Sequence, residues 1–301
     1  MADVKTAKVT AVFGKHIRIF SDGQDYEATV RGKLKKERLY TSPIAVGDEV
    51  EFLISAPGQA VIENVLPRRY FLVRPDTEVI GKRQVVAANL DQLVIITSTR
   101  EPQFKPGLVD RFLVSAEKEK LRTCVVINKI DLAGRGNFRM FANTWDSLGY
   151  RTIFTSAKTG EGLDLLVALL EDKVSALAGH SGVGKSALIN RIQPDLDLKT
   201  RAISKASGKG VHTTTAVVMY HLDINAWVVD TPGLKLFSVV DINKKILQQF
   251  FPELWKTGQE CRFGNCQHIN EPDCAVKQAL QTREIAEFRY LSYRKLWQEV
   301  G

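Results

Sequence analysis

The pattern of apolar and polar residues divides the chain into three stretches, and the first ends near residue 70. Here short apolar segments alternate with turn residues such as Ser21-Asp22-Gly23 and Ala56-Pro57-Gly58, which predicts β-strands joined by turns. Five short strands with a long middle loop fit a small barrel of the OB-fold type. The expected strands are Val9–Phe13, Ile17–Phe20, Ala28–Val30, Val50–Ile54 and Ala60–Val65.

From about residue 88 the pattern changes to strands that alternate with helices. Leu90–Thr97 and Cys124–Ile127 are continuous apolar runs, as expected for strands buried on both faces of a parallel sheet. The alternation predicts a doubly wound α/β domain. The expected helices are Gly107–Lys118, Phe138–Leu148, Gly162–Lys173 and one from Lys185, and the further strands are Thr152–Phe154, Val174–Ala178, Thr215–Leu222 and Ala226–Val229.

After about residue 240 the chain becomes helical and aromatic, with helical segments predicted over Asp241–Leu254 and Ala275–Val300. The sequence therefore predicts a multidomain protein. We expect an all-β OB-fold barrel at residues 1–70, an α/β nucleotide domain at 71–240 and a mainly helical domain at 241–301.

A glycine-rich loop follows the predicted strand Val174–Ala178 and opens the helix at Lys185. It reads Gly179-His180-Ser181-Gly182-Val183-Gly184-Lys185-Ser186-Ala187, which is the phosphate-binding P-loop pattern in the context that the pattern requires. The glycines let backbone N–H groups converge on phosphate oxygens. Lys185 is expected to bridge the β- and γ-phosphates as a catalytic residue, and the Ser186 hydroxyl to bind Mg²⁺. The P-loop alone does not distinguish ATP from GTP.

A second phosphate-sensing segment, Asp230-Thr231-Pro232-Gly233, ends the predicted strand Ala226–Val229. Ligands of open α/β sheets collect at such strand ends. Asp230 is expected to hold Mg²⁺ through water. The Gly233 N–H group can meet the γ-phosphate and lose this bond after hydrolysis, which makes the following segment a switch.

A preference for guanine over adenine nucleotides is predicted from the segment Asn128-Lys129-Ile130-Asp131. The Asp131 carboxylate can accept two hydrogen bonds from guanine N1 and its exocyclic amine, which adenine does not present in that arrangement. Asn128 is expected to brace the loop, and the Lys129 stem to lie over the base. Ser156-Ala157-Lys158 resembles the remaining guanine-contacting loop of GTPases, which offers a backbone N–H to guanine O6. In an ordinary GTPase the P-loop precedes the guanine reader, so the parts are here circularly permuted.

The glycine-rich stretch Gly208–Thr215 occupies the place of a first switch loop. Thr213 or Thr214 is expected to meet Mg²⁺, and the sequence does not decide between them. Ras-like GTPases place a water-orienting Gln after the second switch glycine, but here Leu234 stands there, so intrinsic hydrolysis should be slow. His212 is a candidate catalytic residue that positions the water; the alternative is a histidine merely ordered in the switch.

The C-terminal stretch contains Cys261-x4-Cys266-x-His268-x5-Cys274. Three thiolates and one imidazole complete a tetrahedral Zn²⁺ shell with no open position, which predicts one structural zinc ion. Unconnected surface thiols fit this spacing poorly.

The net charge of +8 on 301 residues favours a polyanionic partner. The loop Arg31–Arg38 carries five basic residues and one acidic residue, and by charge alone it is either a solvated loop or an RNA contact. Its position on the expected OB-fold favours RNA, so we expect residues 1–70 to be an RNA-binding domain. No apolar run is long enough to span a bilayer and the start lacks a secretory signal, so we expect a cytoplasmic protein without a membrane partner. A P-loop ATPase or kinase, and a nucleic-acid-binding scaffold without turnover, remain the alternatives.

The order of these motifs, from the guanine reader through the P-loop and switches to the cysteines, resembles the ribosome small-subunit-dependent GTPase A (RsgA) family over nearly the whole chain. His180 stands where Gln is common in that family. The resemblance implies a GTP hydrolase, converting GTP and water to GDP and phosphate, that binds the 30S subunit and its 16S rRNA late in small-subunit maturation. It also implies hydrolysis stimulated by the subunit and coupled to release. We expect a monomer that uses Mg²⁺ with GTP.

Overall fold

The computed structural model describes residues 4–14, 16–31, 40–76, 79, 81–196, 217–230 and 241–300. The chain divides into two compact units, each assembled from separate stretches of sequence. The first unit comprises Met1–Val94, Leu163–Ala178 and Lys185–Leu236, and the second comprises Ile95–Gly162, Gly179–Gly184 and Phe237–Gly301.

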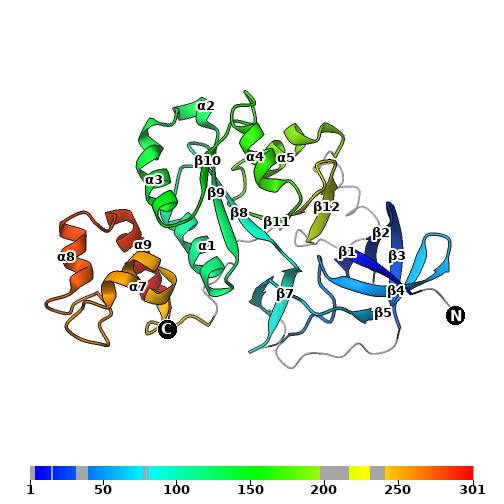
Figure 1. The fold of residues 1–301 in the computed structure, drawn as a ribbon, viewed down its shortest axis with the longest axis horizontal. Helices are drawn as coiled ribbons and strands as arrows, with labels where there is room; N and C mark the ends of the chain where they lie inside the picture. Colours follow the sequence, from blue (N-terminus) through cyan, green and yellow to red (C-terminus); the bar gives the residue numbers. More distant parts are fainter. Residues whose placement is uncertain are drawn as a thin grey trace. The chain divides into compact units, whose positions relative to one another are not determined.

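Five strands at the start of the first unit form a closed barrel (Figure 1). They pair in the order β1-β2-β3-β5-β4, and β1 also pairs with β4, which closes the barrel. Alternate side chains point into a core that includes Val9, Ile19 and Phe52, each with no exposed surface. The predicted barrel is therefore present. The strands are β1 (Lys5–Phe13), β2 (His16–Ser21), β3 (Gln24–Val30), β4 (Glu49–Ala56) and β5 (Gln59–Val65).

A hairpin that the sequence analysis did not predict follows the barrel. Strands β6 (Phe71–Pro75) and β7 (Arg83–Ala88) pair antiparallel with a register shift between Leu72 and Val73. β6 carries Arg74 near its end and β7 begins with Arg83-Gln84, and neither strand alternates apolar and polar residues. The pattern of the sequence alone therefore left this segment unassigned.

The rest of the first unit contains half of the predicted nucleotide domain. Strand β11 (Val174–Ala178) runs parallel to β13 (Ala226–Asp230), and β12 (Val218–Leu222) lies antiparallel to β13. On its other edge β12 pairs with barrel strand β1, with Ala11 opposite Val218. Helices α4 (Leu163–Leu170) and α5 (Lys185–Ile192) and the short turn η2 (Pro194–Leu196) accompany these strands.

The second unit contains the other half of the nucleotide domain. Strand β9 (Arg122–Asn128) pairs in parallel with β10 (Thr152–Phe154). On the other side of β9 lies β8 (Gln92–Ser98), which is buried along its whole length and belongs to this unit from Ile95 onward. The strands alternate with helices, as predicted. These helices are α1 (Pro106–Lys118), α2 (Ile130–Ala133), η1 (Gly136–Phe138) and α3 (Arg139–Ser147).

The C-terminal part of the second unit is helical, but its helices are shorter than predicted. The segment Asp241–Leu254 is not one helix, because Pro252 disfavours a helical conformation at Phe251, which is extended with φ −119° and ψ 93°. A second break occurs where Arg283 adopts a positive φ of 66°. The observed elements are η4 (Leu247–Phe250), α7 (Pro252–Gly258), α8 (Ala275–Gln281) and α9 (Glu287–Glu299).

Crossing a membrane requires a long apolar helix. No helix among the described residues has both the length and the apolar character for this.

Candidate functional site

Asn128, the last residue of β9, connects two loops of the second unit. Its buried side-chain amide donates a hydrogen bond from Nδ2 to the backbone oxygen of Val183 in the P-loop, at 2.8 Å. Its Oδ1 accepts hydrogen bonds from Thr155 Oγ1 at 3.2 Å and from the Ala157 N–H at 3.3 Å. One side chain therefore connects the P-loop to the Ser156-Ala157-Lys158 loop.

The Asp131 carboxylate is oriented from the same loop. Ser156 Oγ donates a hydrogen bond to Asp131 Oδ1 at 2.7 Å and accepts one from the Thr159 N–H at 3.1 Å. Asp131 is exposed, as an acceptor for a ligand must be. Lys129 lies at the left-handed start of α2, with φ of 63°, and its Nζ contacts the backbone oxygen of Glu101.

Two P-loop glycines have positive φ and no room for a side chain. A Cβ on Gly184 would collide with Nδ2 of Asn128, and a Cβ on Gly179 would collide with the backbone oxygen of Ile96. Glycine at these positions lets the P-loop lie directly against β8 and against Asn128. His180 is exposed, and its Nδ1 lies 2.8 Å from the backbone oxygen of Ser181.

Lys185 and Asp230 belong to the first unit, at the start of α5 and the end of β13. Burial lowers the pKa of the Lys185 ammonium, and the negative charge of Asp230 acts against this shift. Burial likewise raises the pKa of the Asp230 carboxyl, and Lys185 acts against it. Each group thus lacks the hydration that its charged form prefers.

The donor set in the first unit suits a magnesium ion. Asp230 Oδ1 is buried and has no hydrogen-bond partner among the residues that the structure describes. A buried carboxylate oxygen without a partner is unfavourable unless a cation or a water satisfies it. The Asp230 carboxylate is a hard oxygen ligand of the kind that Mg²⁺ prefers, and so is the hydroxyl of Ser186, which follows Lys185 at the start of α5.

Several predicted site residues lie outside the described residues. They are His212, Thr213, Thr214 and Gly233, as is most of the basic loop Arg31–Arg38. Ala187, next to Ser186, lies in α5. Lys158 is exposed in the loop that follows β10.

The structure brings the four predicted zinc ligands together in the second unit. The ligand atoms of Cys261, Cys266, His268 and Cys274 all lie within 4.8 Å of one another. Cys261 Sγ is 3.8 Å from Cys274 Sγ, and His268 Nδ1 is 3.5 Å and 3.4 Å from these two sulfurs. Tetrahedral zinc with sulfur ligands at about 2.3 Å requires sulfurs about 3.8 Å apart. The Cys₃His cluster can therefore bind zinc.

Residues that the sequence analysis did not single out support this cluster. Gln248 Oε1 lies 2.5 Å from His268 Nε2 and accepts a hydrogen bond from its N–H group. The other ring nitrogen, Nδ1, is then unprotonated and faces the thiols. The Glu271 carboxylate accepts backbone N–H bonds from Gln267, Ile269 and Asn270 at 2.7 to 3.0 Å. The position of Glu271 between two ligands was the available signal, whereas nothing in the sequence pointed to Gln248.

The protonation states of the cluster follow from its burial. Burial raises the pKa of the Cys266 thiol to about 12 and also raises that of Cys274. Burial lowers the pKa of His268, which keeps its imidazole neutral near pH 7. The neutral imidazole is ready to bind a metal, while the thiols must first lose their protons.

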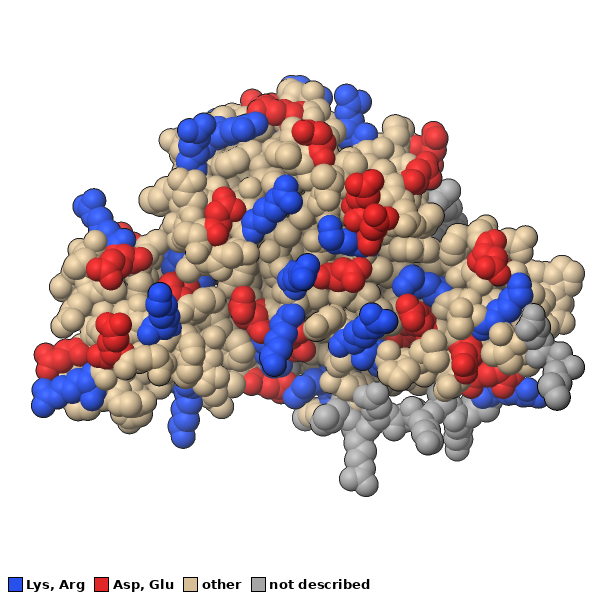
Figure 2. Space-filling view, in the orientation of Figure 1, with Lys and Arg blue, Asp and Glu red and all other residues tan. Residues whose placement is uncertain are grey.

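The net positive charge does not gather on the face drawn in Figure 2. Lys and Arg side chains there are interspersed with Asp and Glu side chains, without a continuous basic area among the described residues. That face by itself does not identify a surface for a polyanion.

Comparisons with known proteins agree with this architecture. The family model of the RsgA GTPase matches residues 65–240. The small ribosomal subunit biogenesis GTPase RsgA 2 of Bacteroides thetaiotaomicron is 36% identical over 92% of this chain and 91% of its own length. The corresponding RsgA protein of Porphyromonas gingivalis (strain W83) is 38% identical over 93% of this chain and 91% of its own length.

Two solved structures extend the similarity to the three-dimensional fold. The crystal structure of YjeQ from Thermotoga maritima is 35% identical, with a TM-score of 0.78 over 99% of both chains. YloQ, described as a circularly permuted GTPase, is 26% identical, with a TM-score of 0.75 over 99% of this chain and 95% of its own. The predicted fold class and permutation are thereby confirmed.

Proposed function

This chain belongs to the RsgA GTPase family and is a GTPase, and on that premise we propose that it acts in the biogenesis of the small ribosomal subunit. The proposed reaction is hydrolysis of GTP to GDP and phosphate, stimulated by the 30S subunit. The names of the relatives support the ribosomal role. Such a role belongs in the cytoplasm, where subunits are assembled.

The observation that carries the nucleotide assignment is the Asn128 side chain, which fixes the P-loop and the guanine-contacting loop to each other. Guanine is read by Asp131, whose carboxylate Ser156 orients, and by the backbone N–H groups of the Ser156-Ala157-Lys158 loop. The N–H groups of Gly179–Gly184 receive the phosphates. Competition between GTP and ATP for the purified protein tests this assignment, because equal affinity would contradict it.

Lys185, Ser186 and Asp230 are proposed to act on the phosphates and on Mg²⁺. The Lys185 ammonium, which burial leaves poorly hydrated, binds the β- and γ-phosphate oxygens. The Ser186 hydroxyl would hold Mg²⁺ directly and the Asp230 carboxylate would hold it through water, and the ion would neutralise negative charge on the phosphates. The Gly233 N–H group would meet the γ-phosphate, and either Thr213 or Thr214 would meet Mg²⁺.

His212 is proposed to position the attacking water, because Leu234 cannot. The apolar Leu234 side chain offers no hydrogen bond to a water molecule, so turnover without the subunit should be slow. A His212→Ala variant should lose subunit-stimulated turnover while it keeps its affinity for GTP. Unchanged stimulated turnover in this variant would remove His212 from the mechanism.

The zinc-binding domain at residues 241–301 is proposed to hold one structural Zn²⁺ and to act with the OB-fold barrel at 1–70 in binding rRNA. Gly233 lies a few residues before this domain in the chain, so loss of the γ-phosphate can change the affinity of the domain for the subunit and promote release. A difference in 30S affinity between the GTP-analogue and GDP states is required. Equal affinities in binding assays with purified subunits would defeat this proposal.

A further inference from the structure

Helix α9 holds the backbone of the metal-binding loop. Tyr290 Oη donates a hydrogen bond to the backbone oxygen of His268 at 2.6 Å. Tyr293 Oη, one turn later, donates to the backbone oxygen of Gln267 at 2.8 Å. The position of α9 and the position of the His268 ligand are therefore linked by two hydrogen bonds.

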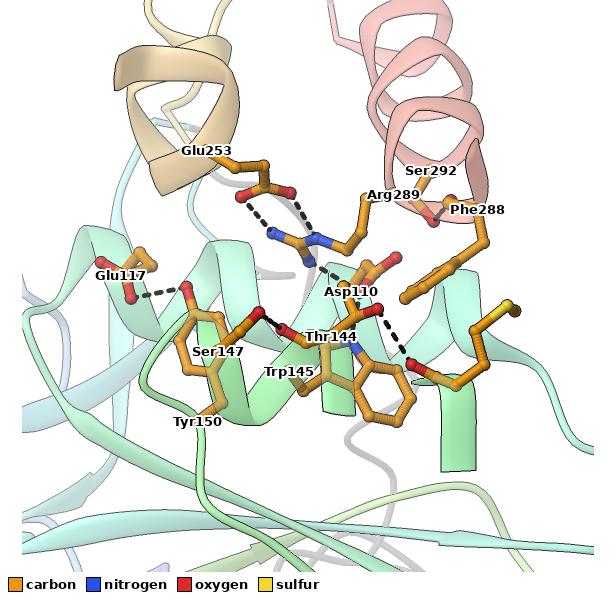
Figure 3. Close-up of polar contacts among 11 residues, drawn as sticks. Asp110, Glu117, Thr144, Trp145, Ser147, Tyr150, Glu253, Phe288, Arg289 and Ser292 are labelled. Atoms are coloured by element: carbon orange, nitrogen blue, oxygen red, sulfur yellow. Dashed lines mark hydrogen bonds and ion pairs between the residues drawn. The ribbon is translucent and has the colours of Figure 1, made fainter. Parts of the chain in front are cut away.

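The same helix is fixed to the nucleotide half of the second unit by a buried charge. The Arg289 side chain has no exposed surface, and its Nη1 lies 2.7 Å from Oδ1 of Asp110 on helix α1. Trp145 of α3 donates a hydrogen bond to the same Oδ1 at 3.0 Å. Figure 3 shows Arg289 between Asp110 and Glu253.

Glu253 on α7 completes this arrangement. Its carboxylate accepts hydrogen bonds from Arg289 Nε at 2.6 Å and from Arg289 Nη2 at 3.2 Å. The guanidinium also lies 4.7 Å from the centre of the Phe251 ring. Burial alone would lower the pKa of Arg289, but the charges of Asp110 and Glu253 raise it, so the guanidinium stays charged. A buried charge with fixed partners resists displacement, because each alternative position leaves a charge unpaired.

Helix α1 continues this connection to the P-loop. Leu108, Val109 and Phe112 of α1 line a cavity of about 110 Å³ together with Gly179, His180 and Val183 of the P-loop. Val109 directly precedes Asp110 in the sequence. A shift of α1 therefore changes the wall against which the P-loop is packed.

We infer that Arg289 is a positioning residue that couples the Cys₃His site to the affinity of the P-loop for nucleotide. The chain of contacts runs from the metal loop through Tyr290 and Tyr293 to α9, from Arg289 to Asp110, and along α1 to the cavity behind Val183. This inference rests on the proposed guanine-nucleotide site. It adds that the metal is more than a local support for the domain, since its presence changes GDP binding elsewhere in the unit.

Coupling between two ligands is reciprocal, which gives a strict test. In the full-length protein, the dissociation constant of a fluorescent GDP is measured with zinc bound and after chelation, and that of zinc with and without GDP. We expect zinc removal to weaken GDP binding roughly 5- to 20-fold, within the usual range of allosteric coupling, and GDP to tighten zinc binding by the same factor. The ratio of the two GDP dissociation constants, without and with zinc, measures the coupling. If this ratio and the corresponding ratio for zinc, without and with GDP, are both one, the inference is overturned.

Variants locate the coupling at Arg289. Arg289→Met should bring the zinc-dependent ratio of GDP affinities close to one, while Arg289→Lys, which keeps the charge, should retain part of it. Lys295→Met, at an exposed position on the same helix, is the control and should keep the wild-type ratio. If Arg289→Met keeps the wild-type ratio, the role assigned to Arg289 is wrong.

Asp110→Asn replaces Arg289→Met if the latter does not fold, because the amide keeps an acceptor for Trp145 and removes the charge. It should reduce the ratio, and an unchanged ratio again contradicts the inference. The zinc-loaded wild type is also compared with GDP and ADP. Preference for GDP without zinc coupling refutes this inference alone, whereas no preference refutes the proposed nucleotide site itself.

Discussion

The Cys₃His cluster and the Lys185–Asp230 region differ in how many ligands the chain itself supplies. At the cluster, four ligand atoms lie within 4.8 Å of one another, and Gln248 holds the histidine ring. Near Lys185, the chain offers the Asp230 carboxylate, with a buried oxygen that has no partner among the described residues, and the Ser186 hydroxyl. The first site is closed, whereas a magnesium ion at the second would need phosphate and water oxygens to complete its shell.

This difference separates a site that contributes to folding from a site that responds to its ligand. A shell of four protein ligands cannot form in the unfolded chain, so metal affinity there becomes folding free energy. A shell shared with a nucleotide forms and dissolves with each catalytic cycle. The following variants test this contrast, beginning with the largest expected effect.

Cys266→Ser should abolish stoichiometric zinc binding and lower the thermal stability of the helical domain. Structural zinc contributes on the order of 10 kcal/mol to the folded form of small zinc domains, whereas this domain also keeps the buried contacts of α9 with α1. Metal content and thermal unfolding measure this loss. Cys124→Ala, which changes the cysteine of β9 outside the cluster, should keep its zinc; a Cys266→Ser protein with a full zinc complement would contradict the closed-site interpretation.

Lys185→Ala should lower subunit-stimulated GTP turnover roughly 100- to 1000-fold, because one charged contact to the reacting phosphate is lost. Zinc content should not change, because Lys185 supplies no ligand to the Cys₃His cluster. Turnover assays and metal analysis are made on the same preparation. Lys256→Ala, an exposed lysine of α7, serves as the control, and wild-type turnover in Lys185→Ala would refute the role of Lys185.

Asp131→Asn should weaken GTP binding roughly 10- to 100-fold, since hydrogen bonds to a charged acceptor contribute about 1.5–3 kcal/mol. The Ser156 hydrogen bond can persist to the amide oxygen, so the loop should stay in place. Competition titrations with GTP and ATP measure the change in preference. Asp164→Asn, at an exposed position of α4, should leave the preference for GTP over ATP unaltered. An undiminished preference in Asp131→Asn would contradict the role of Asp131.

The zinc affinity should fall as the pH falls, by about tenfold per pH unit for each thiol proton that binding displaces. Burial raises the pKa of Cys266 to about 12, so this thiol is protonated at all physiological pH values and contributes throughout pH 6 to 8. His268 adds little there, because burial lowers its pKa. Chelator competition at several pH values measures the slope, and a flat profile would show that Cys266 is not a ligand.

The sequence predicted the features that depend on short-range pattern. The Cys261–Cys274 spacing and the P-loop glycines each lie within one loop, where residue type and spacing determine the chemistry. The barrel strands followed from alternation with clear turns. The predicted long helix failed at Phe251 because a single proline outweighed the helical spacing of several apolar residues.

The features that the sequence did not predict depend on partners far apart in the chain. Arg289 and Asp110 are separated by 179 positions, and each would be assigned to a solvated helix face by its charge alone. Gln248 is likewise 20 positions from His268. Burial of such groups becomes visible only when the fold shows which opposite charge or acceptor compensates them.

The pairing of Ala11 with Val218 has a consequence for dissecting the molecule. A shortened protein that begins after the barrel would leave the outer edge of β12 with open N–H and C=O groups. Exposed edges of this kind recruit strands from other copies, so such a fragment is prone to self-association. Dissection experiments therefore need the barrel retained and its surface residues substituted instead.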